Sequence, residues 1–288
     1  MPYSVWKKVN ATNPNLLLDL LAPLVTFGHH PTTLKHANGV VLDKPGKQSY
    51  DTPASFRIIV LLKTISKILE RILTVRLTSL ARQAGLLHPN QCGSLPGLST
   101  SDAVATLTHE VKTLQRPLLK VSTLFLDIKA GFDNVNASKL QALLLTKNIP
   151  SYMVDWVSSF LTGRKCTLVF QGAPNISAPV SVGTPQGSPL SPLIFHIYVA
   201  PLHFRIPKSI MVSYVDDFSL TVASPSHRSN IRRLQGLFLD ISQRASALEV
   251  SFSVPKTELI HWRTHSQRTA SRSPPSPSTA KFFTRRAW

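Results

Sequence analysis

The sequence predicts an α+β protein, and three observations carry that prediction. Two long stretches, residues 58–84 and 226–248, place apolar side chains at steps of three and four residues, the period of an amphipathic helix. Residues 121–128 form a nearly continuous apolar run, typical of a strand buried on both faces. Residues 209–224 alternate apolar and polar positions around a short turn, which predicts a half-buried hairpin.

Shorter signals predict the remaining elements. The Gly- and Pro-containing segment 88–99 is expected to be a loop, after which Ser101 and Asp102 cap a helix. The Gly-, Pro- and Ser-rich segment 182–192 is expected to lead into an apolar helix. Further helices are predicted at 15–21, 101–115, 137–147, 152–161 and 190–204, and further strands at 40–42, 166–170, 178–182, 250–254 and 259–262.

The charge balance indicates a polyanionic partner. The chain has 32 Lys and Arg against 14 Asp and Glu, a net charge of +18, so nucleic acid is the favoured partner. No basic amphipathic helix with an aromatic face stands out, which disfavours a membrane. Two distant cysteines exclude a disulfide framework and a CxxC zinc site, and the apolar run 16–27 is too short to span a bilayer, so the protein is expected to be intracellular and not secreted.

Three carboxylates mark the candidate site. Asp216 and Asp217 stand side by side at the apex of the predicted hairpin, where they form either a solvated turn or a site for a divalent cation. Asp127 ends the buried strand 121–128, an unusual place for a charge. Carboxylates at the ends of neighbouring strands, in a strongly basic protein, suit two divalent cations used for phosphoryl transfer.

Four motifs then resemble one family in their order and spelling. FLDIKAGFD, GTPQGSPLSP, YVDD and PKTE are similar to the successive palm motifs of reverse transcriptases encoded by non-LTR (LINE-type) retrotransposons. The upstream KPGK, FRIIVLLKTISKILERIL and QCGSLPGLSTSDAV segments are similar to the finger segments of that family, and the resemblance covers about residues 30–262.

The resemblance implies a right-hand polymerase fold with fingers and palm, in which an antiparallel palm sheet packs on helices. It implies an N-terminal extension over 1–30, fingers over 31–120, and a palm over 121–262 with inserted finger-side segments. The Ser-, Pro- and Arg-rich tail 263–288 contains no acidic residue and is expected to be disordered. This tail begins where the family continues into the thumb, and no endonuclease precedes the fingers, so the thumb is expected to be missing and the sequence is expected to be a truncated or frameshifted copy.

The resemblance also implies a role for each matched residue. Asp127 and Asp216, assisted by Asp217, would bind two Mg²⁺ or Mn²⁺ ions, with the Ile128 carbonyl as a further oxygen ligand. Lys256 would neutralise or protonate the leaving pyrophosphate. The nucleotide-binding residues would be Phe132, which would exclude a ribose 2′-hydroxyl, Gln186 and Gly187, which would line the nucleotide and template pocket, and Arg57, which would lie near the triphosphate.

The implied function is RNA-directed DNA polymerisation, with an RNA template, a DNA primer and dNTPs as partners, in a nuclear or cytoplasmic ribonucleoprotein. The sequence differs from the family pattern at Ile58, Ser94 and Leu95, so the resemblance leaves open whether the chain is catalytically active. Two alternatives stand beside it. One is an inactive fragment that only binds RNA or RNA/DNA hybrid, and the other is an RNA-dependent RNA polymerase, against which Phe132 counts. The oligomeric state is left open by the sequence.

Overall fold

The structure is a computed structural model that describes residues 1–46, 49–95, 97–169, 175–204, 206–207 and 211–262. The predicted disordered tail 263–288 and the first two residues of the predicted hairpin lie outside the described residues. The chain divides into two compact units. Unit 1 comprises residues 1–86 and 132–198, and unit 2 comprises residues 87–131 and 199–288.

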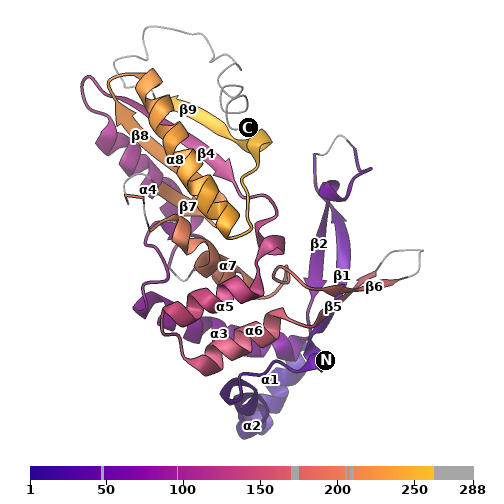
Figure 1. The fold of residues 1–288 in the computed structure, drawn as a ribbon. Helices are drawn as coiled ribbons and strands as arrows, with labels where there is room; N and C mark the ends of the chain where they lie inside the picture. Colours follow the sequence, from indigo (N-terminus) through magenta and orange to yellow (C-terminus); the bar gives the residue numbers. More distant parts are fainter. Residues whose placement is uncertain (47–48, 96, 170–174, 205, 208–210, 263–288) are drawn as a thin grey trace. The chain divides into compact units, whose positions relative to one another are not determined.

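Unit 1 contains a four-stranded mixed sheet in the order β2-β1-β5-β6 (Figure 1). Strand β1 (His36–Asp43) pairs antiparallel with β2 (Phe56–Leu61) and parallel with β5 (Arg164–Val169), which pairs antiparallel with β6 (Ile176–Val180). The predicted hairpin is therefore confirmed, with its second strand two residues earlier than the predicted 178–182. Phe170, the last residue of the first predicted strand, lies outside the described residues. The parallel β1–β5 pairing joins segments more than 120 residues apart, and no local signal could have predicted it.

The helix predicted over 58–84 is wrong at its beginning. Residues 58–61 belong to β2, and helix α3 starts only at Thr64 (Thr64–Gln83). The run Phe56–Leu61 contains Ile58, Ile59 and Val60, whose branched side chains favour a strand, and β1 offers the partner. The apolar period of a helix and the apolar run of a strand overlap here, so periodicity alone assigned the strand to the helix.

The described part of unit 1 contains five further α-helices: α1 (Tyr3–Thr12), α2 (Pro14–Thr26), α5 (Ala137–Thr146), α6 (Ser151–Leu161) and all but the last residue of α7 (Ser191–Val199). Helix α1 was not predicted, and none of its residues is buried. The core is formed by Leu69, Leu73 and Leu77 of α3 and by the apolar residues of α7, all of which are at most 1% exposed.

Unit 2 contains a five-stranded sheet in the order β3-β7-β8-β4-β9. Strand β4 (Lys120–Asp127) is flanked on both sides by antiparallel partners, β8 (Asp217–Ser224) and β9 (Glu258–Trp262). The hairpin of β7 (Met211–Tyr214) and β8 confirms the prediction for this stretch, and β3 (Gln91–Cys92) adds a short parallel edge. Helix α8 (His227–Ala247) crosses the sheet over β8 and β4 in Figure 1, and α4 (Thr100–Leu114) contacts β7 and β8.

Two local predictions in unit 2 are corrected. The N-cap of α4 is Ser99 rather than Ser101, because Ser99 and Asp102 form a reciprocal capping box. The predicted strand 250–254 is a single bridge between Phe252 and Ile128, since the chain turns into a 3-10 helix at Val254–Lys256. Among the described residues, no helix is long and apolar enough to cross a bilayer.

Burial of His30 predicts a pH-dependent stability for unit 1. This side chain is 1% exposed and packs edge-on against Trp156 and Phe160, at ring-centroid distances of 5.0 and 5.3 Å. Burial, with the charge of Lys35, lowers the pKa of His30 from 6.5 to about 4. Between these two pH values the unfolded chain binds a proton at His30 that the folded chain does not bind. The contribution of His30 to the free energy of unfolding is therefore fully present above pH 6.5, and the free energy of unfolding falls by roughly 3 kcal/mol as the pH drops to 4.

Urea unfolding followed between pH 7 and pH 4 measures this effect. We expect His30→Leu to remove most of the slope, whereas the exposed neighbour His29, whose charge contributes least to the lowered pKa of His30, should leave most of the slope when it is replaced in the same way. Equal pH slopes in the wild type and in His30→Leu would show that another group controls the acid sensitivity.

Candidate functional site

The three predicted carboxylates meet at one end of the unit 2 sheet. Asp127 is the last residue of β4 and Asp217 is the first residue of β8, and the two are direct partners in the antiparallel register. Asp216 lies in the turn just before β8, where its backbone carbonyl accepts a hydrogen bond of 3.0 Å from the Ile128 amide. Strand pairing therefore gathers side chains that lie about 90 positions apart in the sequence.

The turn that presents the two adjacent carboxylates is held in an uncommon conformation. Val215 has a φ of +56°, in the left-handed region that β-branched residues rarely adopt. Its amide donates to the Cys92 carbonyl on β3 at 3.1 Å, and the ring of Tyr214 lies against Gly93. Gly93 has a φ of +87°, and a Cβ there would come within 2.8 Å of the Tyr214 ring. The close packing of this loop thus fixes the turn at the tip of the hairpin.

Lys256 lies at the same end of the sheet. Its Nζ atom donates to Asp127 Oδ1 at 2.8 Å, and the Lys256 side chain is 65% exposed whereas that of Asp127 is 16% exposed. The 3-10 helix Val254–Lys256 carries this lysine, and the preceding Ser253 amide donates to the Asp127 carbonyl at 2.7 Å. The position of the ion pair is therefore set by the 3-10 helix that carries Lys256 and by the hydrogen bond from the Ser253 amide to the Asp127 carbonyl.

The electrostatics of this cluster favour a bound cation. The pKa of Asp217 is raised by burial and by the neighbouring charges of Asp216 and Asp127, with Lys256 acting in the opposite direction. The pKa of Lys256 is raised by its hydrogen bond to Asp127 and by the same three carboxylates. The three carboxylates repel one another at this end of the sheet, and a nearby positive charge reduces this repulsion.

The donor chemistry fits Mg²⁺ or Mn²⁺, which prefer hard carboxylate and carbonyl oxygens. Within the described part of the chain, no three His, Cys, Asp or Glu side chains already enclose a common point. Mg²⁺ commonly uses only one or two protein carboxylates and completes its shell with water and substrate phosphates. The three aspartates are therefore sufficient in number and type, and the Ile128 carbonyl offers another oxygen at the end of β4.

The remaining predicted residues lie in unit 1, where the loop before α7 is anchored from several sides. The Gln186 carbonyl accepts from the Val60 amide of β2 at 2.8 Å, and the Gln186 side-chain amide donates to Asp133 Oδ1 at 3.0 Å. Gly187 has a φ of +141°, and a Cβ there would approach the Val60 carbonyl oxygen to 2.3 Å. Only glycine allows this close approach of loop and strand.

Phe132 and Arg57 are also placed within unit 1. The half-buried Phe132 ring stacks on Phe195 of α7 at a centroid distance of 4.9 Å, and its carbonyl accepts from the Thr184 amide at 2.7 Å. Arg57 is exposed on β2, three residues before Val60. The structure thus gathers Asp127, Ile128, Asp216, Asp217 and Lys256 in unit 2, and Arg57, Phe132, Gln186 and Gly187 in unit 1.

Two residues that position the loop were missed from the sequence. Glu70 of α3 is fully buried and accepts hydrogen bonds of 2.5 Å from Ser66 and from Ser188, the residue after Gly187. Arg164 of β5 is 8% exposed and donates to the carbonyls of Val182 and Gly183 at 3.0 and 2.6 Å. Burial lowers the pKa of Arg164 to about 10.

A signal for Glu70 was present in the sequence. It stands within the apolar stripe of its helix, three residues before Leu73, where a carboxylate is unexpected. Arg164 carries no such signal, because its role depends on a loop that lies nearly twenty residues later.

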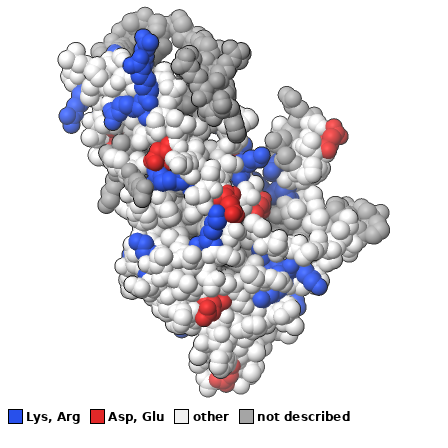
Figure 2. Space-filling model, viewed as in Figure 1, with Lys and Arg blue, Asp and Glu red and all other residues white. Residues whose placement is uncertain are grey.

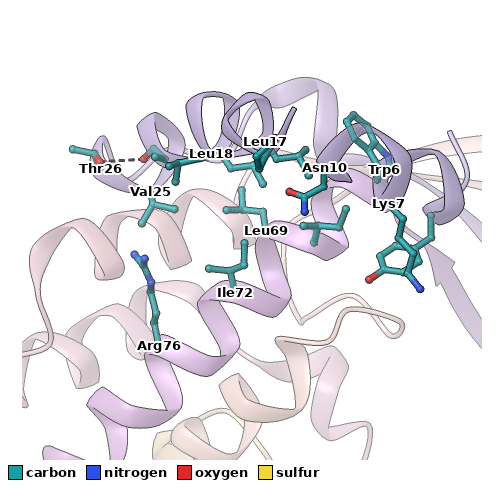
Figure 3. Close-up of a pocket in the computed structure, with 15 residues that line it drawn as sticks. Trp6, Lys7, Asn10, Leu17, Leu18, Val25, Thr26, Leu69, Ile72 and Arg76 are labelled. Atoms are coloured by element: carbon teal, nitrogen blue, oxygen red, sulfur yellow. Dashed lines mark hydrogen bonds between the residues drawn. The ribbon is translucent and has the colours of Figure 1, made fainter. Parts of the chain in front are cut away.

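A separate apolar groove lies in unit 1 between α1, α2 and α3 (Figure 3). It has a volume of about 520 Å³, and its lining includes Trp6, Leu18 and Ile72, with Lys7 and Arg76 as its cations. Its lining contains no carboxylate, so it does not suit a hard metal ion. The candidate chemistry therefore lies with the aspartates rather than with this groove.

Comparison with known proteins identifies relatives of the chain. Residues 42–282 match the family described as "Reverse transcriptase (RNA-dependent DNA polymerase)". The match therefore continues past β9 into the segment for which the sequence predicts disorder.

Three curated relatives carry names of the same kind. The chain is 29% identical over 224 residues to "Probable RNA-directed DNA polymerase from transposon X-element" of Drosophila melanogaster, covering 76% of this chain and 24% of the relative. It is 29% identical over 212 residues to the corresponding protein of transposon BS from the same organism, covering 71% and 23%. It is 25% identical over 244 residues to the polymerase of mobile element jockey, also from D. melanogaster, covering 80% and 26%. The chain thus spans about a quarter of the length of these relatives.

The fold is shared with solved structures. An apo telomerase from Candida tropicalis, truncated from its C-terminal domain, superposes with a TM-score of 0.57 and 13% identity, covering 81% of this chain and 51% of the telomerase chain. The telomerase of the same organism in complex with a fragment of telomeric RNA gives the same TM-score and identity over 91% and 45%. The α+β right-hand polymerase fold expected from the sequence is confirmed.

Proposed function

Because the chain belongs to the reverse transcriptase (RNA-dependent DNA polymerase) family, we propose that it extends a DNA primer 3′-hydroxyl with dNTPs on an RNA template. The observation that carries this proposal is the register of β4 and β8, which makes Asp127 and Asp217 direct partners next to Asp216. Lys256 adds a cation that hydrogen-bonds to Asp127. Nucleotidyl transfer needs this combination, because negative charge develops on the phosphates during the reaction.

In this proposal Asp127, Asp216 and Asp217 hold two Mg²⁺ or Mn²⁺ ions, with the Ile128 carbonyl as an additional ligand. When bound, the ions lower the pKa of the primer 3′-hydroxyl and neutralise charge on the triphosphate. The crowding that raises the pKa of Asp217 supports the proposal, since a divalent ion removes the repulsion that causes it.

The other residues act on the substrate directly. The exposed ammonium of Lys256 can leave Asp127 to neutralise or protonate the departing pyrophosphate, because its side chain is 65% exposed. Phe132, fixed by its stacking on Phe195, blocks the space that a ribose 2′-hydroxyl requires and so favours dNTPs. Gln186 and Gly187 line the nucleotide and template pocket, and Arg57 binds the triphosphate. The same partners imply an intracellular ribonucleoprotein.

Primer extension on an RNA template with dNTPs and Mg²⁺ tests the proposal. We expect extension by the wild type and a loss of about 10²- to 10³-fold or more in Asp216→Asn, which keeps the shape of the side chain and removes its charge. Asp19→Asn, at an exposed site on α2, is the matched control and should extend normally. A folded wild type that binds RNA and yields no product would contradict the proposal and leave the inactive RNA-binding fragment.

A further inference from the structure

A cluster of cations lies at the end of unit 2 where β4 begins and β8 ends. Lys120, the first residue of β4, is the partner of Ser224, the last residue of β8, and α8 starts three residues later at His227. The turn before β4 contributes one more cation, and the first turns of α8 contribute three. We call this set the basic end surface: Arg116, Lys120, Arg228, Arg232 and Arg233.

Hydrogen bonds from α8 bring these cations together. The Asn230 side-chain amide donates to the Lys120 carbonyl at 2.7 Å and to Ser122 Oγ at 2.9 Å, which ties the helix to the start of β4. Arg233 donates to the Ala223 carbonyl at 2.9 Å, which ties it to the end of β8. The four arginines of the surface are exposed and Lys120 is partly exposed. The cluster is therefore a property of the packed unit and not only of the sequence.

The sequence segments that carry these cations contain no acidic residue. The sequence contains no Asp or Glu in residues 111–122 or 223–239, and the first turn of α8 carries no acid. Arg228 lies in the first turn of α8, where the partial positive charge of the helix N-terminus disfavours a cation and stabilises an anion. Figure 2 shows Lys and Arg side chains over the end of unit 2 where α8 begins. An exposed cluster of cations of this kind attracts a polyanion.

The basic end surface is separate from the aspartates. Lys120 and Asp127 are the two ends of β4, and a strand of eight residues places them about 23 Å apart at roughly 3.3 Å per residue. A template strand spans this distance only when it continues at least about seven nucleotides from the reacting base pair at Asp127, at about 3.4 Å per nucleotide.

We propose that the basic end surface binds the phosphate backbone of the RNA template, at a distance from the reacting nucleotide. The identity of the occupant as an RNA template rests on the proposed function, whereas binding at this surface requires no chemistry. An anionic membrane is disfavoured because α8 buries Leu234 and Ile241 fully, and a single exposed apolar side chain of this helix, Leu239 at 57% exposed, does not form an apolar face for lipid. One side chain in the adjoining turn, Leu118, is 90% exposed, which is too little for membrane insertion.

Fluorescence anisotropy with a labelled 30-nucleotide single-stranded RNA, titrated at several salt concentrations, tests the proposal. The test variant replaces Arg116, Arg228 and Arg232 with Gln and keeps Arg233, whose hydrogen bond to Ala223 supports the fold. We expect affinity to fall by about tenfold or more and the slope of log K against log salt to become shallower by about 2, as for three lost phosphate contacts on a single strand.

The matched control replaces Lys7, Lys8 and Arg76 of unit 1 with Gln and removes the same net charge. We expect it to change the salt slope by less than half as much. Equal losses in the two variants would show that only net charge matters and would overturn the proposal. Retained RNA affinity with lost binding to phosphatidylserine vesicles would overturn it in favour of a membrane.

Template length separates this proposal from the polymerase activity. If the wild type extends primers, we expect it to extend a 20-base-pair primer–template more efficiently than one of six base pairs, and we expect the test variant to lose this advantage of the longer duplex. A wild type that extends nothing would contradict the proposed function, while the anisotropy comparison would still decide the basic end surface.

Discussion

Replacing Gly187 with Ala is expected to disable the loop that carries Gln186. The new Cβ would lie 2.3 Å from the Val60 carbonyl oxygen, a backbone atom that cannot turn away, and Gly187 has a φ of +141°. Overpacking and backbone strain each cost about 1–3 kcal/mol, so the loop must leave β2 or unit 1 loses a large part of its stability. We expect primer extension to fall by about 10²-fold, in line with misplacement of a substrate-positioning group.

Gly85 provides the matched control, because it also has a positive φ, +64°, but a Cβ there would meet nothing within 4 Å. Gly85→Ala should cost only the backbone term, about 1–2 kcal/mol, and should leave extension intact. Thermal unfolding and primer extension of both variants separate the two contributions. Similar behaviour of the two variants would mean that the contact with Val60 is not tight in solution.

Local patterns were sufficient to predict the elements that bear the aspartates. The apolar run of the strand that ends at Asp127 and the alternation of the hairpin around Asp216 are local signals that tertiary contacts only reinforce. Their meeting was predicted through the resemblance of motifs, because the register that pairs Asp127 with Asp217 is set by the whole sheet. The roles of these residues in catalysis are still predictions.

Non-local contacts limit what the sequence can predict. The division into units falls within one motif, since Asp127 belongs to unit 2 and Phe132, five residues later, belongs to unit 1. The strand Phe56–Leu61 was missed because it is defined by its pairing with β1, and the apolar period within one segment carries no information about a partner strand. The hydrogen bond between Glu70 and Ser188 joins residues 118 positions apart, so only the folded chain reveals why a carboxylate interrupts an apolar stripe.

Glu70→Ala is expected to destabilise unit 1 strongly. The substitution leaves the buried hydroxyls of Ser66 and Ser188 without the carboxylate that accepts their hydrogen bonds. Each buried hydroxyl left without a partner costs about 1–3 kcal/mol. Urea unfolding measures the loss directly. The loop that carries Gln186 should also lose its position, which would raise the KM for dNTPs if the proposed polymerase activity holds.

Glu70→Gln is the matched control, because it keeps the length of the side chain and one acceptor oxygen while removing the charge. Burial raises the pKa of Glu70 above its ordinary value of 4.5, although the hydrogen bonds from Ser188 and Ser66 oppose this. The folded state therefore holds the proton more tightly than the unfolded state, and wild-type stability falls as the pH rises above 4.5. The stability of Glu70→Gln relative to the wild type should thus increase from pH 4.5 toward neutrality. A difference that stays constant with pH would show that Glu70 is not buried as a charge, and an unchanged urea midpoint in Glu70→Ala would show that its two serine contacts do not stabilise the fold.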